Sequence, residues 1–342
     1  MTDKPFITIE QQIALLENER HLTFLDREAA KNTLRRYGYY EIVNGYKENY
    51  LKNPADDSAG YKSTATFEHI FAMFTLDKRI REDILRALEE FETSFKQALA
   101  YAVAEDISDS DKYYTAPSHY NAGSSHMWKG KNYTERDNLL KCFKNIRKSR
   151  NEPFNHYKTH HGNIPPWIMV KGMSFGNAMF WYRLSKPIVR RHVISIMFGL
   201  DTDLVDVLDT HFKIKQAFGD MLDLFLNYRN LCAHGGRVYN HRSAKHQLRQ
   251  SKFLYREAVI EVSRNKFLKG EMRSSPGVVL TCLKLFENKD PYNELWIWLA
   301  IDISHHLKKF PEDKEYLINS MELTDIKCLD SISEFQAKKD SR

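Results

Sequence analysis

The sequence predicts an all-α protein. Apolar residues recur three or four positions apart along almost the whole chain, as in Ile84, Leu88, Phe91 and Phe95, which is the spacing of one helix face. No segment alternates clearly between apolar and polar residues as a half-buried strand does. With 342 residues, 42% of them hydrophobic and 13% aromatic, the chain can bury a substantial core in two or three subdomains.

Capping residues, glycine and proline mark where helices begin and end. Thr8 with Gln11 has the pattern of a capping box that opens a helix over residues 9–18. A second helix is expected over residues 27–37, where Gly38 ends it. Further helices are expected over residues 67–105, 136–150, about 166–199, about 204–234, 241–264 and about 277–321. Residues 106–134 are polar and are expected to form an exposed loop.

The stretch NPADDSAGYKS, residues 53–63, is rich in turn formers and is the first expected boundary. We therefore expect an N-terminal helical segment over residues 1–60 and a helical core over residues 61–265. A C-terminal helical extension is expected over residues 266–342.

Composition excludes several classes of protein. The four cysteines form no CxxC pair, so neither a zinc ribbon nor a disulfide framework is expected, and a reducing cytoplasm is favoured. The N-terminus has no basic head followed by an apolar stretch, and no apolar run approaches the roughly 18 residues of a membrane span. A net charge of +6 permits binding to nucleic acid without requiring it.

The stretch YRNLCAHGGRVYN, residues 228–240, ends an apolar helix with charged groups. Gly235 and Gly236 are typical of a helix C-terminus. Asn230 and His234 are four residues apart and share a helix face, whereas Arg229 points roughly 140° away from His234. One straight helix therefore cannot direct both side chains at one phosphate, but a bent helix end or two copies of the chain can.

An isolated pair of this kind carries little information. With 21 arginines and 14 histidines in the chain, about one Arg-x4-His pair is expected by chance. The helix dipole also favours Arg and His near a helix C-terminus. Arg150 and His156 form a similar pair, but Pro153 interrupts the helix between them.

The residues around the pair are more specific. RNLCAHGGRVYN resembles the RN-x-CAH-x-x-R-x-x-N signature of the Abi family, the abortive-infection proteins of the AbiD and AbiF kind. These proteins carry a HEPN domain, whose R-x4-6-H motif marks many metal-independent endoribonucleases. One departure is Gly235, where many members have a second histidine. Other segments match in order: KPFITIEQQIALLE, YGYYEIVNGYK (which favours AbiF), LDKRIR, Glu92 with Lys96, PWI at 166–168 and SFG at 174–176.

The resemblance implies a HEPN-type helical bundle that cleaves RNA without a metal ion or other cofactor. The ribose 2′-hydroxyl would attack the phosphate, leaving a 2′,3′-cyclic phosphate. Histidine is suited to proton transfer near neutral pH, and arginine to the charge on the phosphorane. We therefore take Arg229, Asn230 and His234 as catalytic candidates, with Arg237 and Asn240 as support or as structural anchors of the turn.

The resemblance also implies phage defence, with RNA as substrate and a small RNA or a protein as antitoxin. A homodimer is expected, because one motif per chain would need a second copy to complete the site, and the apolar motif helix was expected to spare a face for the interface. The alternative is a HEPN module that binds RNA or a partner without cutting it. The intact Arg229 and His234 pair favours the enzyme.

Outside the motif, Glu92 and Lys96 are expected to form a surface ion pair, with active-site support as the alternative. Two basic groups are candidates for contact with the RNA backbone, although solvated helix faces give the same pattern. They are Lys245, Arg249, Lys252 and Arg256, at helical spacing, and Lys141, Lys144, Arg147, Lys148 and Arg150. Two groups of histidines were weighed as metal ligands, His156 with His160 and His161, and His305 with His306 after Asp302. No metal site is expected, because no carboxylate lies at a typical ligand spacing.

Overall fold

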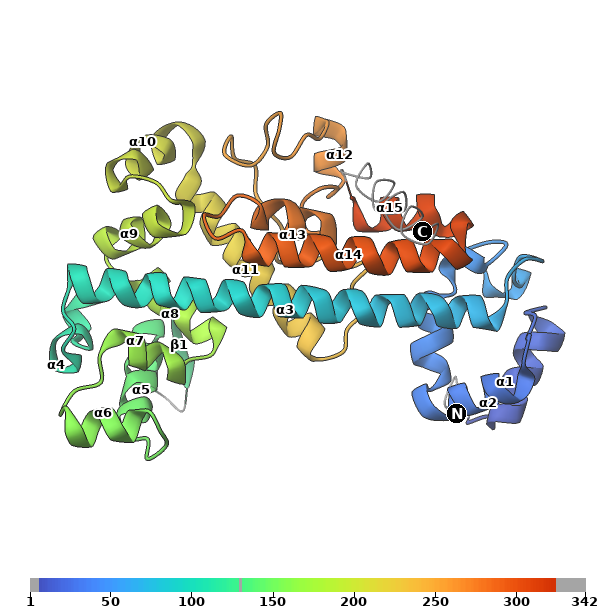
Figure 1. Cartoon of the computed structure of the whole chain (residues 1–342), viewed down its shortest axis with the longest axis horizontal. Coiled ribbons are helices and arrows are strands. Elements are labelled where there is room, and N and C mark those ends of the chain that lie inside the picture. Colours follow the sequence, from blue (N-terminus) through green and yellow to red (C-terminus); the bar gives the residue numbers. More distant parts are fainter. Residues whose placement is uncertain (1–5, 129–130, 324–342) are drawn as a thin grey trace, which may run out of the picture. The chain divides into compact units, whose positions relative to one another are not determined.

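The computed structural model describes residues 6–128 and 131–323. Most of these residues are helical, and the one small sheet among them is a two-stranded hairpin (Figure 1), so the prediction of an all-α protein is confirmed. Contacts group the chain into two compact units. The first unit contains the residues up to Asp83, Leu231–His241 and the chain from Trp296, and the second contains Ile84–Asn230 and Arg242–Leu295. The division into three consecutive segments stays a prediction.

The chain passes from one unit to the other inside three long helices. These are α3 (Phe67–Asp106), α11 (Ile214–Ala233) and α14 (Asp290–Lys309). The first has the length that the apolar spacing predicted, and Ile84, Leu88 and Phe91 are all buried.

Helix ends in the first unit follow the predicted capping. The backbone N–H of Thr8 donates to the side chain of Gln11 at 2.7 Å while the Thr8 hydroxyl accepts from the Gln11 N–H, which is the predicted capping box. Helix α2 (Arg27–Tyr37) ends at Gly38, whose φ is +86°. The unit also contains α1 (Ile9–Ala14), α15 (Lys314–Met321) and the short turns η1 (Leu15–Glu19), η2 (Tyr40–Asn44), η3 (Glu48–Tyr50), η4 (Asp57–Ala59) and η7 (Pro311–Asp313).

The second unit has an aromatic core. The ring of Phe91 on α3 contacts Phe225 on α11 and Phe286 edge to face, with centroids 4.8 Å apart in both pairs. The helices are α4 (Asp111–Tyr114), α5 (Glu135–Arg147), α6 (Phe154–His160), α7 (Pro166–Met169), α8 (Phe175–Leu184), α9 (Pro187–Phe198), α10 (Thr202–Phe212), α12 (Arg264–Leu268) and α13 (Pro276–Leu283), with η5 (Pro117–His119) and η6 (Val170–Gly172).

This core uses the apolar side of the motif helix. Phe218, Met221 and Phe225 of α11 are completely buried within their own chain. These side chains are therefore not available to a dimer interface, and the homodimer stays a prediction.

The expected loop over residues 106–134 is more ordered than its polar sequence indicated. Strands β1 (Ser125–Trp128) and β2 (Lys131–Thr134) form a small antiparallel hairpin. Tyr114 and Tyr120 are buried, and the Tyr114 hydroxyl donates to the carbonyl of Ile164 at 2.5 Å. Buried aromatic rings with satisfied hydroxyls fold the segment back onto its unit.

The expected helix over residues 241–264 is absent. No continuous run of bonds to the fourth preceding carbonyl forms in this stretch, and two of its backbone N–H groups bond to carbonyls far along the chain. Leu248 donates to the carbonyl of Arg273 at 2.9 Å, and Phe253 donates to the carbonyl of Phe212 at 3.0 Å. Lys245, Arg249, Lys252 and Arg256 therefore do not form the helical stripe that their spacing predicted.

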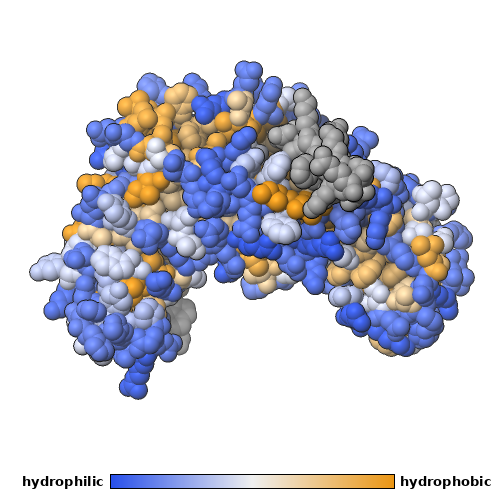
Figure 2. Space-filling view, viewed as in Figure 1, coloured by the Kyte–Doolittle hydropathy of each residue, from blue (hydrophilic) through white to orange (hydrophobic). Residues whose placement is uncertain are grey.

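The visible surface is mainly hydrophilic, with hydrophobic residues gathered over α9 and α10 (Figure 2). Ile188, Leu204 and Val207 are the large exposed apolar side chains on these two helices. Across the described residues, every helix falls short of the length or the apolar character needed to cross a bilayer.

Candidate functional site

The two glycines after α11 close the helix in a specific way. The Gly236 N–H donates to the carbonyl of Leu231 at 2.9 Å, and the Gly235 N–H donates to the carbonyl of Cys232 at 3.2 Å. This pair of bonds is the Schellman arrangement, with Gly235 in the left-handed region at φ +77°. A Cβ at Gly236 would lie 2.2 Å from the Cδ1 of Leu231, so a larger residue there would require the Leu231 side chain to move. His234 is consequently the C-cap residue that directly follows α11, and it is exposed.

The chain after the glycines is held by a buried carboxylate. Asp77 on α3 is fully buried, and its Oδ1 accepts the backbone N–H groups of Val238 at 3.0 Å and Tyr239 at 2.7 Å. Its Oδ2 accepts the Tyr46 hydroxyl at 2.7 Å. Burial raises the pKa of Asp77, and the hydrogen bonds and the nearby Arg81 oppose that rise.

Arg81 holds the glycines themselves. It lies one turn after Asp77 on α3, and its Nη1 donates to the carbonyl oxygens of Gly235 and Gly236, both at 3.1 Å. A cation at these carbonyls also interacts favourably with the C-terminal end of the α11 dipole. Asp77 and Arg81 together fix the backbone on both sides of the turn, and this fixes the position from which His234 projects.

His234 opens onto a cleft of about 560 Å³ in the first unit. Arg36, Arg81 and Arg237 line it together with His234, and Glu41 is the one acidic residue among the lining residues. The other side chains in the lining are mostly aromatic: Tyr37, Tyr40, Tyr46 and Phe74. Tyr40 is exposed, Tyr37 and Phe74 are half-buried, and Tyr46 is buried. A cleft with several guanidinium groups and accessible aromatic rings has the chemistry that binds single-stranded nucleic acid, where cations contact phosphates and bases stack on rings.

Arg237 has a structural contact as well as a place in this cleft. Its Nη1 donates to the carbonyl of Gly45, just after η2. Asn240 follows in the same turn and is half-buried. The interpretation of Arg237 as an anchor of the turn therefore agrees with its contacts.

Arg229 and Glu92, two candidates from the sequence, meet in the second unit. The Arg229 Nε lies 3.6 Å from the Glu92 Oε2. Both atoms are buried without a hydrogen-bond partner among the described residues. Since 3.6 Å is too long for a hydrogen bond, the pair is an ion pair that a small shift of the guanidinium would tighten or release.

Lys96 completes this group. Its Nζ donates to the Glu92 Oε1 at 2.5 Å and to the carbonyl of Met173 at 2.6 Å. The expected ion pair of Glu92 and Lys96 is therefore present, but it does not lie at the surface: Glu92 is 9% exposed and bridges Lys96 and Arg229. A bridging carboxylate orients the Arg229 guanidinium, whereas Asn230, the next residue, is exposed.

Cys232 lies between these candidates in sequence but is unsuited to nucleophilic chemistry. Burial raises the pKa of its thiol to about 12, so the thiol stays protonated near neutral pH.

The remaining basic candidates lie in two settings. Arg249 forms an ion pair with Asp220, with Nη2 and Oδ1 2.7 Å apart, whereas Lys245 is exposed and Lys252 and Arg256 lie in the same irregular segment. In the other group, Lys144, Arg147 and Lys148 line a separate cleft of about 310 Å³ in the second unit, together with Lys158 and Asp111. Lys141 is on the same helix, α5.

The sequence analysis did not select Arg36, Tyr37 or Arg81 as site residues. Tyr37 and Arg81 lie in the segments YGYYEIVNGYK and LDKRIR, which carry the family resemblance, and Arg36 directly precedes the first of these. The only sequence feature that could have identified these three residues was their place within or beside a segment that matches the family. Their spacing in the sequence does not link α2 and α3 to His234.

Replacing Asp77 tests whether it holds the turn. Asp77→Ala leaves the N–H groups of Val238 and Tyr239 buried without an acceptor, so we expect the free energy of unfolding to fall by about 3 kcal/mol. Urea denaturation followed by circular dichroism measures this loss. Glu82→Ala, an exposed change on the same helix, should stay within about 0.5 kcal/mol of the wild type. Equal effects of the two substitutions would mean that Asp77 does not anchor the turn.

Comparison with known proteins agrees with this geometry. The model of the Abi-like protein family matches residues 32–240, more than half of the chain. The match contains Asp77, Arg81, Glu92, Arg229 and His234. Searches among curated proteins and among solved structures gave no match. The extent of the family match shows that the chain belongs to the Abi-like protein family.

Proposed function

We propose that this protein is an abortive-infection factor of the HEPN type, related to AbiF, which cleaves RNA without a metal ion. Membership of the Abi-like family suggests phage defence by abortive infection. The observation that carries the proposal is the exposed imidazole of His234, held on a fixed turn at the edge of a cleft with three arginines. Cleavage of host or phage RNA would arrest growth, so an antitoxin, either a small RNA or a protein, would restrain the activity.

The chemistry needs a proton acceptor, a proton donor and a cation. In the proposed reaction the 2′-hydroxyl loses its proton to an imidazole while its oxygen attacks phosphorus. The bond from phosphorus to the 5′-oxygen then breaks, and that oxygen takes up a proton. His234 is suited to proton transfer because histidine titrates near neutral pH. An arginine stabilises the charge on the phosphorane through its planar fork.

The divergent directions of Arg229 and His234 on one helix support a homodimer. His234 of one copy would face Arg229 of a second copy across a two-fold axis, so that each chain contributes one residue to the site. Arg229 of one copy or the other would then stabilise the phosphorane, released from Glu92 by the movement of the guanidinium. Asn230, exposed beside it, would orient an imidazole or a phosphate oxygen.

A second candidate is a HEPN module that binds RNA or a protein partner without cutting it. The ion pair between Arg229 and Glu92 favours this alternative, since a guanidinium held by a carboxylate also has a purely structural use. In that case the cleft of His234 would bind RNA and no product would form.

The ends of the RNA products test the reaction. Purified protein with excess EDTA should cut single-stranded RNA and leave 2′,3′-cyclic phosphate and 5′-hydroxyl ends, because the nucleophile belongs to the ribose. Mass spectrometry of the fragments identifies the ends. Products with 3′-hydroxyl and 5′-phosphate ends would show attack by water, as in metal-dependent nucleases, and would overturn the proposal.

Substitutions test the two motif residues. His234→Ala should lower cleavage about 100-fold or more and leave the melting temperature nearly unchanged, because the side chain is exposed. Arg229→Ala should also abolish cleavage, and Glu92→Gln should be much milder. His156→Ala, an exposed change on α6, is the control and should keep full activity. If Glu92→Gln and Arg229→Ala lose activity and stability equally, Arg229 is structural.

The same variants test the dimer. A mixture of Arg229→Ala and His234→Ala proteins should regain part of the activity when each mixed dimer assembles one site from intact residues. Full activity of a protein that stays monomeric in light scattering would rule out the composite site.

Substitutions of two neighbouring arginines on α2 test whether RNA binds in the cleft of His234. Arg36 lines the cleft, whereas Arg35 lies 3.8 Å from Glu10. In the inactive His234→Ala background, Arg36→Gln should weaken binding of single-stranded RNA several-fold and reduce the slope of log K against log salt by about 1. Arg35→Gln removes the same charge and should change binding little. Equal weakening would indicate a diffuse charge effect, with no RNA in the cleft.

A further inference from the structure

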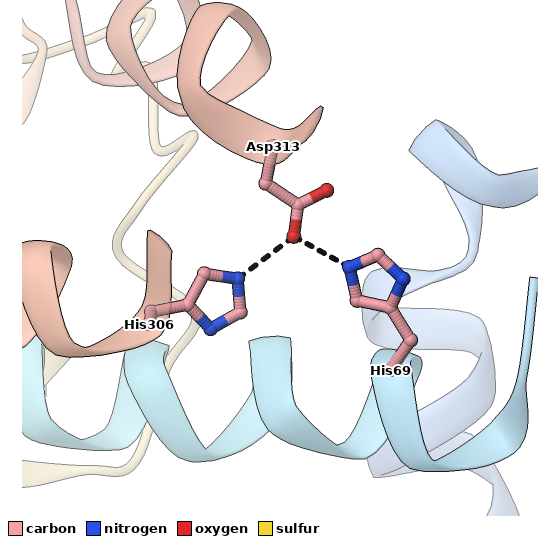
Figure 3. A group of neighbouring side chains, drawn as sticks. All are labelled: His69, His306 and Asp313. Carbon is pink, nitrogen blue, oxygen red and sulfur yellow. Dashed lines mark hydrogen bonds and ion pairs between the residues drawn. The ribbon is translucent and has the colours of Figure 1, made fainter. Parts of the chain in front are cut away.

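A buried cluster in the first unit brings together three residues that are far apart in sequence. His69 lies on α3, His306 on α14, and Asp313 at the end of η7 (Figure 3). The Asp313 Oδ2 lies 2.8 Å from the His69 Nε2 and 2.7 Å from the His306 Nε2. One ligand atom from each residue lies within 4.8 Å of the others. No sequence spacing indicated this group.

The cluster is enclosed. His69 is 4%, His306 7% and Asp313 0% exposed. The ring of Phe310 stacks on His69 with the centroids 3.9 Å apart. Ligands enclosed in this way are typical of structural metal sites, whereas catalytic sites keep a position open to substrate.

The hydrogen bonding of Asp313 favours a cation. Asn49 donates to its Oδ1 at 3.1 Å, and the Tyr50 hydroxyl donates to its Oδ2 at 3.1 Å. If both imidazoles also donated protons to Oδ2, this one oxygen would accept three bonds, although a carboxylate oxygen has about two lone-pair sites. A cation bound by the two Nε2 atoms and Oδ2 removes the excess of donors, because the nitrogens then act as ligands.

A carboxylate also lies near the other nitrogen of His69. The Glu312 Oε1 is 3.7 Å from the His69 Nδ1. Histidines that bind metals commonly donate this second N–H to a carboxylate, which fixes the tautomer with a free lone pair on the ligating nitrogen. Asn49 and Tyr50 hold Asp313 in the same supporting way.

We propose that His69, His306 and Asp313 bind one divalent transition-metal ion. Zn²⁺ fits two imidazoles and one carboxylate best, with water as the fourth ligand. None of the three ligands lines the cleft of His234, so the ion is structural and takes no part in RNA cleavage. It ties the start of α3 to the end of α14 and to the turn before α15. The inference does not depend on the proposed function.

Metal content tests this site directly. Full-length protein is incubated with Zn²⁺, desalted and analysed by mass spectrometry for zinc. The wild type should retain about one zinc ion per chain, and His306→Ala should retain none. His305→Ala is the matched control, because His305 is the adjacent residue but is exposed, and this variant should retain zinc as the wild type does.

Melting temperatures and Co²⁺ provide independent readouts. Zinc should raise the melting temperature of the wild type and of His305→Ala but not of His306→Ala. Co²⁺ bound in place of zinc should give the visible absorption of a low-coordinate site. If His306→Ala fails to fold, His69→Gln replaces one ligand by an amide that can still donate a hydrogen bond. Wild-type protein that retains no zinc, or a His306 variant that retains as much as the wild type, would overturn the proposal.

Discussion

The candidate site depends on the buried carboxylate of Asp77. It accepts the N–H groups of Val238 and Tyr239, which would otherwise be buried without partners after the chain leaves α11. Unsatisfied groups of this kind cost about 1–3 kcal/mol each, so the path of the chain after the two glycines is strongly constrained. Arg81, one helical turn further along α3, binds the glycine carbonyls from the same side. Asp77 and Arg81, both on α3, thus fix the turn from which His234 projects.

The Arg229 group has a different character. Its guanidinium is paired at 3.6 Å and is not fully hydrogen-bonded, and the carboxylate that holds it is shared with Lys96. A phosphate that makes hydrogen bonds to the Arg229 guanidinium could therefore replace Glu92 as its partner. The distinction between an enzyme and a binding module therefore depends on how easily Glu92 releases Arg229.

Most of the fold could be predicted from the sequence, because capping and helical spacing act locally. Thr8, Gly38 and Gly235 mark helix ends in the structure as they do in the sequence. The helix expected over residues 241–264 does not form, because N–H groups such as those of Leu248 and Phe253 bond to distant carbonyls. Local helix propensity contains no information about such partners. The hairpin after Tyr120 was missed because its strands have four residues each, which is too short for a clear alternation of apolar and polar residues.

Prediction of the site was less complete. His234 and Arg237 were identified from the motif and line the cleft. Glu92, which the family resemblance offered as a supporting residue of the site, forms an ion pair with Arg229. Arg36 and Arg81 reach the cleft from α2 and α3, which only the tertiary fold brings together. The cluster of His69, His306 and Asp313 was missed for the same reason. His306 stood out in the sequence beside His305, but its partners His69 and Asp313 come from other segments.

The central claim is that RNA lies in the cleft of His234. Photo-crosslinking tests it most directly, with a 4-thiouridine oligonucleotide whose 2′-O-methyl groups prevent cleavage. The account predicts crosslinks, identified by mass spectrometry, to peptides that contain Tyr37, Tyr40 or Tyr46. Crosslinks confined to the cleft of Lys144 and Lys158, in a protein that still cuts unmodified RNA, would contradict it.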